Sequence, residues 1–304
     1  MTAVTNAPGA GGVRQAGGVR AWAAARGLSG RMWLAVPGAL FMVAFFVYPV
    51  IYGVGLSLQG QGGVLSSYTG FFSQPYLRDT IWITLKIALP AALITVAAAL
   101  PVAYRMRGRL RAKRLIIILI MIPMTLGAVF IADGMIDFLG PQGWLNRVLM
   151  SLHLIGQPLV LIHNTVGVVL SMVIAIFPLA FLLTLGYVSG IHPSLESAAA
   201  VLGAGPAQRF WRVLLPLLAP GLTITFCLAF VMSFQVFPSA VLVGDPAGAT
   251  HVISLAAYQQ YSQADYSSAS AIAMVMAVVQ LAVLGAAFAA RSLWYRGPTT
   301  GGKG

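Results

Sequence analysis

Long uninterrupted runs of apolar residues dominate this chain, and polar positions are confined to the short segments between them. A helix needs about 20 mostly apolar residues to cross the hydrocarbon core of a bilayer. Six runs are long enough, and they cover residues 32–58, 80–104, 115–138, 159–188, 217–243 and 267–290. The pattern therefore predicts an all-α membrane protein with six transmembrane helices.

Composition supports a membrane protein and argues against an enzyme. Hydrophobic residues make up 59% of the 304 positions and charged residues only 8%, which is more apolar side chain than one soluble core encloses. The single cysteine, Cys227, excludes an intrachain disulfide, and the four histidines have no metal-ligand spacing. We expect no catalytic residue and no metal site.

The basic residues predict the orientation of the chain. Fifteen of the 18 Lys and Arg residues fall on one side of the six spans. They are Arg14, Arg20, Arg26, Arg31, Arg105, Arg107, Arg109, Arg111, Lys113, Arg114, Arg209, Arg212, Arg291, Arg296 and Lys303. Positive loops remain in the cytoplasm, so both termini are expected there. The net charge of +12 is then a sign of topology, and no nucleic-acid partner is expected.

Three parts follow along the chain. Residues 1–31 are rich in Gly, Ala and Arg, have no apolar core of their own, and are expected to form a disordered cytoplasmic tail. Residues 32–292 contain all six spans and form one transmembrane domain. Residues 293–304 are expected to form a second cytoplasmic tail.

The segment 192–216, between the fourth and fifth spans, carries helix-capping residues. A short helix is expected over about 195–202, with Ser194 as its N-cap. Glu196 would then lie in the first turn, where a negative charge interacts favourably with the helix dipole. This is the largest cytoplasmic connection that the topology predicts.

A break and a second helix follow within the same segment. Gly203 and Gly205 permit a sharp change of backbone direction, and Pro206 suits the first turn of a new helix. Arg209 and Arg212 on that helix are placed to reach lipid headgroups. The sequence predicts two helices, separated by a glycine break, lying under the membrane.

The spacing of this segment resembles the signature of binding-protein-dependent ABC importer permeases, which reads Glu-Ala-Ala, three residues, Gly, nine residues, Ile-x-Leu-Pro. Gly203 is followed after nine residues by the sequence Val-Leu-Leu-Pro at 213–216. Counting back from Gly203 places Ser197 at the signature glutamate, and Glu196 stands one position early. The resemblance implies an ATPase-coupling role for Glu196, Ser197, Ala198, Ala199, Gly203, Ala204, Val213, Leu215 and Pro216.

Softer likenesses point to the putrescine/spermidine-type branch of these permeases. They are the Tyr48-Pro49 exit from the first span and the stretches 84–106 and 242–260. The resemblance implies a subunit of the bacterial inner membrane that pairs with a second permease chain in a heterodimer. Its other partners would be cytoplasmic ABC ATPase subunits, which use ATP, and an extracytoplasmic solute-binding protein. No cofactor is expected in this chain.

Two other functions stay open at this stage. An importer permease for a sugar or another small solute would share the same coupling segment. A secondary transporter is the less favoured alternative, because such proteins are built from internal repeats with paired broken helices and no repeat is evident here.

Four polar residues within predicted spans are candidates for the substrate pathway. Asp133 and Asp137 lie one helical turn apart and would attract a cation, although a solvated outer edge explains them almost equally well. Ser233 and Gln235 flank Phe234 just before a helix-breaking proline, where interhelical packing is the alternative.

Overall fold

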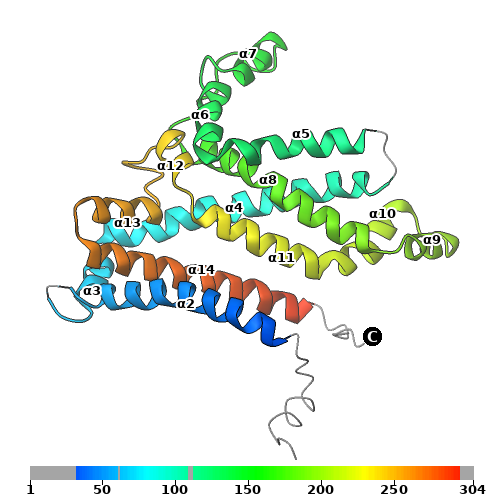
Figure 1. Ribbon diagram of the computed structural model, residues 1–304. Coiled ribbons are helices and arrows are strands. Elements are labelled where there is room, and N and C mark those ends of the chain that lie inside the picture. Colours follow the sequence, from blue (N-terminus) through cyan, green and yellow to red (C-terminus); the bar gives the residue numbers. More distant parts are fainter. Residues whose placement is uncertain (1–31, 61, 109–111, 295–304) are drawn as a thin grey trace, which may run out of the picture. The chain divides into compact units, whose positions relative to one another are not determined.

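The computed structural model describes residues 32–60, 62–108 and 112–294, and these form helices joined by loops, without strands (Figure 1). The expected tail 1–31, most of the tail 293–304, and Arg109 and Arg111 lie outside the described residues. The prediction of an all-α membrane protein is confirmed.

Five helices are long and apolar enough to cross a membrane, and a bent pair brings the number to six. The five are α2 (Met32–Ser57), α4 (Pro75–Met106), α8 (Thr165–Gly190), α11 (Leu215–Phe234, continuous with the helical residues from Pro206) and α14 (Tyr266–Trp294). α2 runs on through Pro49, so the Tyr48-Pro49 dipeptide is not the exit from the first span. Shorter helices on the loops are α3 (Ser66–Ser73), α7 (Trp144–Ser151), α12 (Pro238–Leu242) and α13 (Ile253–Ser262).

α4, α8 and α11 form the centre of the domain that follows α2, and α4 packs against both of the others. Fully buried alanines on α4, at positions 88, 91 and 92, allow neighbouring backbones to approach closely. Phe230 and Phe234 of α11 fill the space opposite them in the same apolar cluster. α4 is therefore the central helix of the core, in contact with both α8 and α11.

The third predicted span, 115–138, is wrong as a single straight helix. α5 (Lys113–Leu126) ends at Gly127, and the chain from Ala128 to Ser151 leaves at 105° to it, starting with α6 (Ala128–Leu139). Gly127 has a φ of 80°, a conformation that glycine adopts at little cost and that ends a helix. With 14 residues, α5 is about 21 Å long, so it is too short to cross the hydrocarbon alone.

Two other spans differ from prediction at one end. The fourth begins at Thr165 and not at 159, because His163 has a φ of 57° and the Asn164 side chain caps the helix by accepting from the Gly167 N–H at 3.0 Å. The fifth ends at Phe234 and not at 243, since Pro238 begins the separate helix α12.

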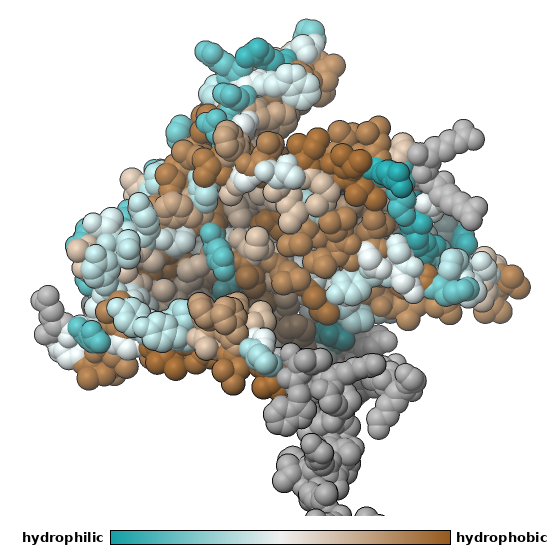
Figure 2. Space-filling view, viewed as in Figure 1, coloured by the Kyte–Doolittle hydropathy of each residue, from teal (hydrophilic) through white to brown (hydrophobic). Residues whose placement is uncertain are grey.

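Polar and apolar surfaces are separated in the way a bilayer requires. Figure 2 shows hydrophobic residues over the length of α5, α8 and α11, and hydrophilic residues gathered at the end where the chain turns from α4 into α5. The C-terminal end of α4, the first turn of α5 and the segment after α8 lie at this end (Figure 1). It is the end that the positive-inside rule assigns to the cytoplasm.

Candidate functional site

The predicted first helix of the 192–216 segment is present as α9 (Ser194–Val201), with Glu196 in its first turn. Ser194 as N-cap is wrong, because Pro193 occupies the cap position and Ser194 is the first helical residue. The Ser194 hydroxyl lies 2.7 Å from His192 Nδ1 and is thereby held away from the free N–H groups of the first turn. No side-chain cap therefore fixes the tilt of α9.

The break after α9 is a Schellman motif centred on Gly203. The Ala204 N–H donates to the Ala199 carbonyl and the Gly203 N–H to the Ala200 carbonyl, both at 3.0 Å. Gly203 has a φ of 84°, the left-handed conformation that this motif demands. A Cβ at position 203 would meet no other atom within 4 Å, so backbone conformation and not space makes glycine necessary.

The second helix is also present, but it is not a regular α-helix. α10 (Pro206–Arg209) starts at Pro206 as predicted and passes into η1 (Phe210–Leu214), a π-helical turn in which the Leu215 N–H donates to the Phe210 carbonyl. Pro216 follows immediately; its ring would clash with the carbonyl four residues earlier in a regular α-helix. A π turn opens the backbone just before that proline, and such turns are frequent at functional sites.

Glu196 points toward its own chain. Its Oε1 accepts from Arg107 Nη1 at 2.7 Å and its Oε2 from the Tyr104 hydroxyl at 3.4 Å. Within the described residues this is the one ion pair, and its side chains are only 19% (Arg107) and 14% (Glu196) exposed. The Arg107 guanidinium also lies 5.3 Å from the centre of the Tyr104 ring.

The pKa of Glu196 is held below its ordinary value, chiefly by the hydrogen bond from Arg107 and further by the charges of Arg107 and Arg209, against partial desolvation. A carboxyl with a depressed pKa stabilises the fold above its unfolded pKa of about 4.3 and loses that contribution as the pH falls through the folded value.

Thermal unfolding in detergent is therefore expected to show an acid-sensitive difference between the wild type and Glu196→Gln. The gap in unfolding free energy should be about 1 kcal/mol or less between pH 8 and pH 5, and it should close as the pH falls below about 4. A gap that persists at pH 3 would mean that the carboxylate charge is not its cause.

The predicted coupling residues fall into two groups. Ser197 and Ala198 are exposed on α9, and Ser197 Oγ donates back to the Pro193 carbonyl at 3.3 Å. Beyond them, Val201 and Leu202 are 88% and 87% exposed, although both are apolar. Of the remaining predicted residues, Ala199, Ala204, Val213 and Leu215 are half-buried, while Gly203 in the turn and Pro216 in the first turn of α11 are exposed.

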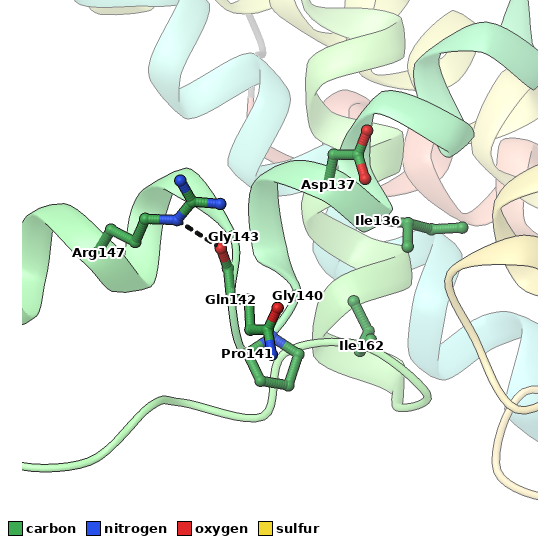
Figure 3. A pocket seen from close by; sticks show the side chains of 8 residues that line it. All are labelled: Ile136, Asp137, Gly140, Pro141, Gln142, Gly143, Arg147 and Ile162. Carbon is green, nitrogen blue, oxygen red and sulfur yellow. Dashed lines mark hydrogen bonds between the residues drawn. The ribbon is translucent and has the colours of Figure 1, made fainter.

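Asp133 and Asp137 are both exposed on α6, as expected for one helix face. Asp137 borders an open pocket of about 680 Å³ where α6 turns into α7 (Figure 3). Arg147, on the far side of the turn in Figure 3, donates from Nε to the Gln142 carbonyl at 2.7 Å. The pocket thus presents the carboxylate of Asp137 and the guanidinium of Arg147 to solvent.

Ser233 and Gln235 separate in the structure. Ser233 is fully buried in α11, and its hydroxyl has no partner among the described residues, whereas Gln235 is exposed just past the helix end. α12, which begins three residues after Gln235, packs against α6, and Val243 just after α12 lies in one apolar cluster with Met135 of α6. The contact with α6 is therefore made by α12 and not by the segment that carries Ser233 and Gln235.

Sequence reasoning missed four residues that the geometry singles out: Arg107, Tyr104, Val201 and Leu202. Arg107 was counted only as one of the basic residues that set topology, and its partner lies 89 positions away. The apolar pair Val201 and Leu202 lies at the end of the short helix predicted over about 195–202 and carries no separate prediction. Two adjacent aliphatic residues before a helix-ending glycine, outside any span, are the signal that could have marked them.

Residues 91–292 match the model of the family described as binding-protein-dependent transport system inner membrane component. The chain belongs to this family. Its members are transport permeases and not enzymes, and the matched region includes α8, α9 and the whole of the Gly203 turn.

Individual relatives of the permease are similar over most of its length. The spermidine/putrescine transport system permease protein PotB of Haemophilus influenzae is 27% identical over 59% of this chain, and the chain covers 63% of that relative. A probable sulfate transport system permease protein cysT of Nephroselmis olivacea is 27% identical over 81% of this chain and 84% of its own length.

A solved structure has the same fold. In the crystal structure of a bacterial alginate ABC transporter in complex with an alginate pentasaccharide-bound periplasmic protein, one chain superposes with a TM-score of 0.71. That chain is 20% identical to this permease, and the superposed region covers 84% of this permease and 93% of that chain.

Proposed function

We propose that this permease forms half of the translocation pathway of an ATP-driven importer and is coupled through α9 to a separate ATPase subunit. The observation that carries the proposal is the α9–Gly203–α10 unit with Val201 and Leu202 exposed at its tip. Exposed aliphatic side chains beyond the membrane-spanning region favour a protein partner. ATP would be bound and hydrolysed by that partner, and this chain needs no cofactor.

The other partners in the proposal are a second permease subunit and an extracytoplasmic solute-binding protein, in a bacterial cell membrane with both termini in the cytoplasm. The concentration of basic residues at the α9 end supports this orientation. The alginate transporter, whose structure includes a periplasmic protein, supports the binding-protein partner by analogy of fold.

Purification in mild detergent tests the coupling proposal. We expect a nucleotide-binding subunit to copurify with the tagged chain and to hydrolyse ATP faster when the loaded binding protein is added. Recovery of this chain alone, with solute transport in vesicles that contain no ATP, would instead indicate a secondary transporter.

For the substrate we propose a polyamine such as putrescine or spermidine. The similarity to PotB supports it, as does the pair of exposed carboxylates, Asp133 and Asp137, on one face of α6. The second candidate is an anion such as sulfate. The cysT relative favours it, and so does Lys86, an exposed lysine about 16 Å along α4 from its first residue.

Uptake of labelled putrescine and sulfate by the reconstituted transporter separates these substrates. If a polyamine is carried, Asp137→Asn should lower putrescine uptake about fivefold, equivalent to about 1 kcal/mol, while Lys86→Gln leaves it nearly unchanged. Asp79→Asn, an exposed acid at the start of α4, is the control for a general effect of surface charge. Sulfate uptake that is lost in Lys86→Gln would overturn the polyamine proposal.

A further inference from the structure

Side chains from two neighbouring elements act on the carboxylate of Glu196, and a third element packs against one of them. The C-terminal end of α4 contributes Arg107 and Tyr104, at 2.7 Å and 3.4 Å from the two carboxylate oxygens. α10 contributes Arg209, whose charge acts on Glu196. η1 contributes Phe210, whose ring packs edge-on against the Tyr104 ring with centroids 5.6 Å apart. Glu196 of α9 is thus bonded to the C-terminal end of α4, beside a tyrosine that also packs against η1.

This contact matters because the backbone leaves α9 loosely attached. α9 follows an exposed His192-Pro193 pair, and it ends at the Gly203 turn. The close backbone contacts of α9 are with α10 and η1, which begin the continuous helix that leads into α11. The Gly203 turn separates α9 from that helix, so the backbone joins the two through a single glycine break.

The ion pair between Glu196 and Arg107 offers a second connection, which bypasses the glycine break. It joins α9 to the last turn of α4, the helix that packs against both α8 and α11 at the centre of the domain. Charge-assisted hydrogen bonds of this length are short and directional. Displacement of α9 by a partner would therefore pull the end of α4 with it.

We propose that Glu196 is a positioning residue that ties the coupling helix to α4 through Arg107, and that it does not contact the ATPase. The carboxylate at the position before the signature glutamate faces the permease, while Ser197 at the signature position is exposed. This inference rests on the proposed function, because it assigns a task to one residue of the coupling segment.

A double-mutant cycle tests the inference in proteoliposomes that contain the ATPase, the second permease and the loaded binding protein. The variants are Glu196→Gln, Arg107→Gln and the combination of both. The quantity to measure is solute transported per ATP hydrolysed, together with retention of the ATPase. Arg105→Gln is the control, because Arg105 is exposed on the same last turn of α4 and has no ion pair among the described residues.

Each single substitution is expected to lower transport per ATP about fivefold, and the double substitution should lower it no further, since residues that act through one contact are not additive. ATPase retention should stay within about twofold of the wild type in all variants, and Arg105→Gln should behave as the wild type.

Three results would overturn the inference. Unchanged transport per ATP in Glu196→Gln would show that the pair transmits nothing, and a roughly 25-fold loss in the double variant would show that the two residues act independently. Loss of the ATPase in Glu196→Gln alone would show that Glu196 contacts the partner. If the wild-type chain itself retains no ATPase, the proposed function fails first, and that outcome is distinct from these.

Discussion

Gly203→Val is expected to reduce ATP-driven transport at least tenfold while the chain still inserts into the membrane. Gly203 has a φ of 84°, and a β-branched residue in that conformation is strained by roughly 1–2 kcal/mol or more. The strain is relieved by opening the Schellman hydrogen bonds from Ala204 and Gly203 to the last turn of α9. α9 would then leave the orientation in which its tip is presented to the ATPase.

Two substitutions separate this cause from loss of space. Gly205→Ala is the matched control, because Gly205 has a φ of −66° and, as at Gly203, nothing lies within 4 Å of an added Cβ. It should transport as the wild type does. Gly203→Asn should recover a large part of the activity, since asparagine tolerates the left-handed conformation better than other side chains. Equal transport by Gly203→Val and Gly205→Ala would mean that the turn geometry has no role in coupling.

The long helices and the two-helix coupling segment could be predicted because each depends on local signals. Run length alone placed α2 within one residue of its observed bounds, and Pro206 marked the start of α10. The bend at Gly127 could not be predicted in this way. A glycine inside an apolar run is as compatible with close helix packing as with a positive φ, and only the surrounding structure decides between them.

Side-chain pairing was the harder part of the site. Ser194 has the chemistry of an N-cap, but the neighbouring His192 ring takes its hydroxyl. Glu196 fitted the helix dipole at its position, and no local pattern indicates that it bonds to Arg107 rather than to another basic residue of the α4–α5 connection. Contacts between residues 89 positions apart follow from the packing of helices, which the spacing of one segment does not encode.

Placing a charge at the tip of α9 is expected to release the ATPase. Val201 and Leu202 are 88% and 87% exposed, so neither supports the fold of this chain. Burial of such side chains in a partner contributes about 1.5–3 kcal/mol each, and a buried unpaired carboxylate opposes association further.

Leu202→Asp should therefore weaken ATPase binding at least 30-fold, equivalent to about 2 kcal/mol, and Val201→Asp should have a similar effect. ATPase copurification at graded detergent and salt concentrations measures the loss, and the yield of folded permease should be unchanged because both residues are exposed. Leu154→Asp is the control. Leu154 is 67% exposed in the loop after α7, so this substitution introduces the same charge away from α9. Full retention of the ATPase by Leu202→Asp would exclude the tip of α9 from the interface and transfer the coupling role to the exposed face around Ser197 and Ala198.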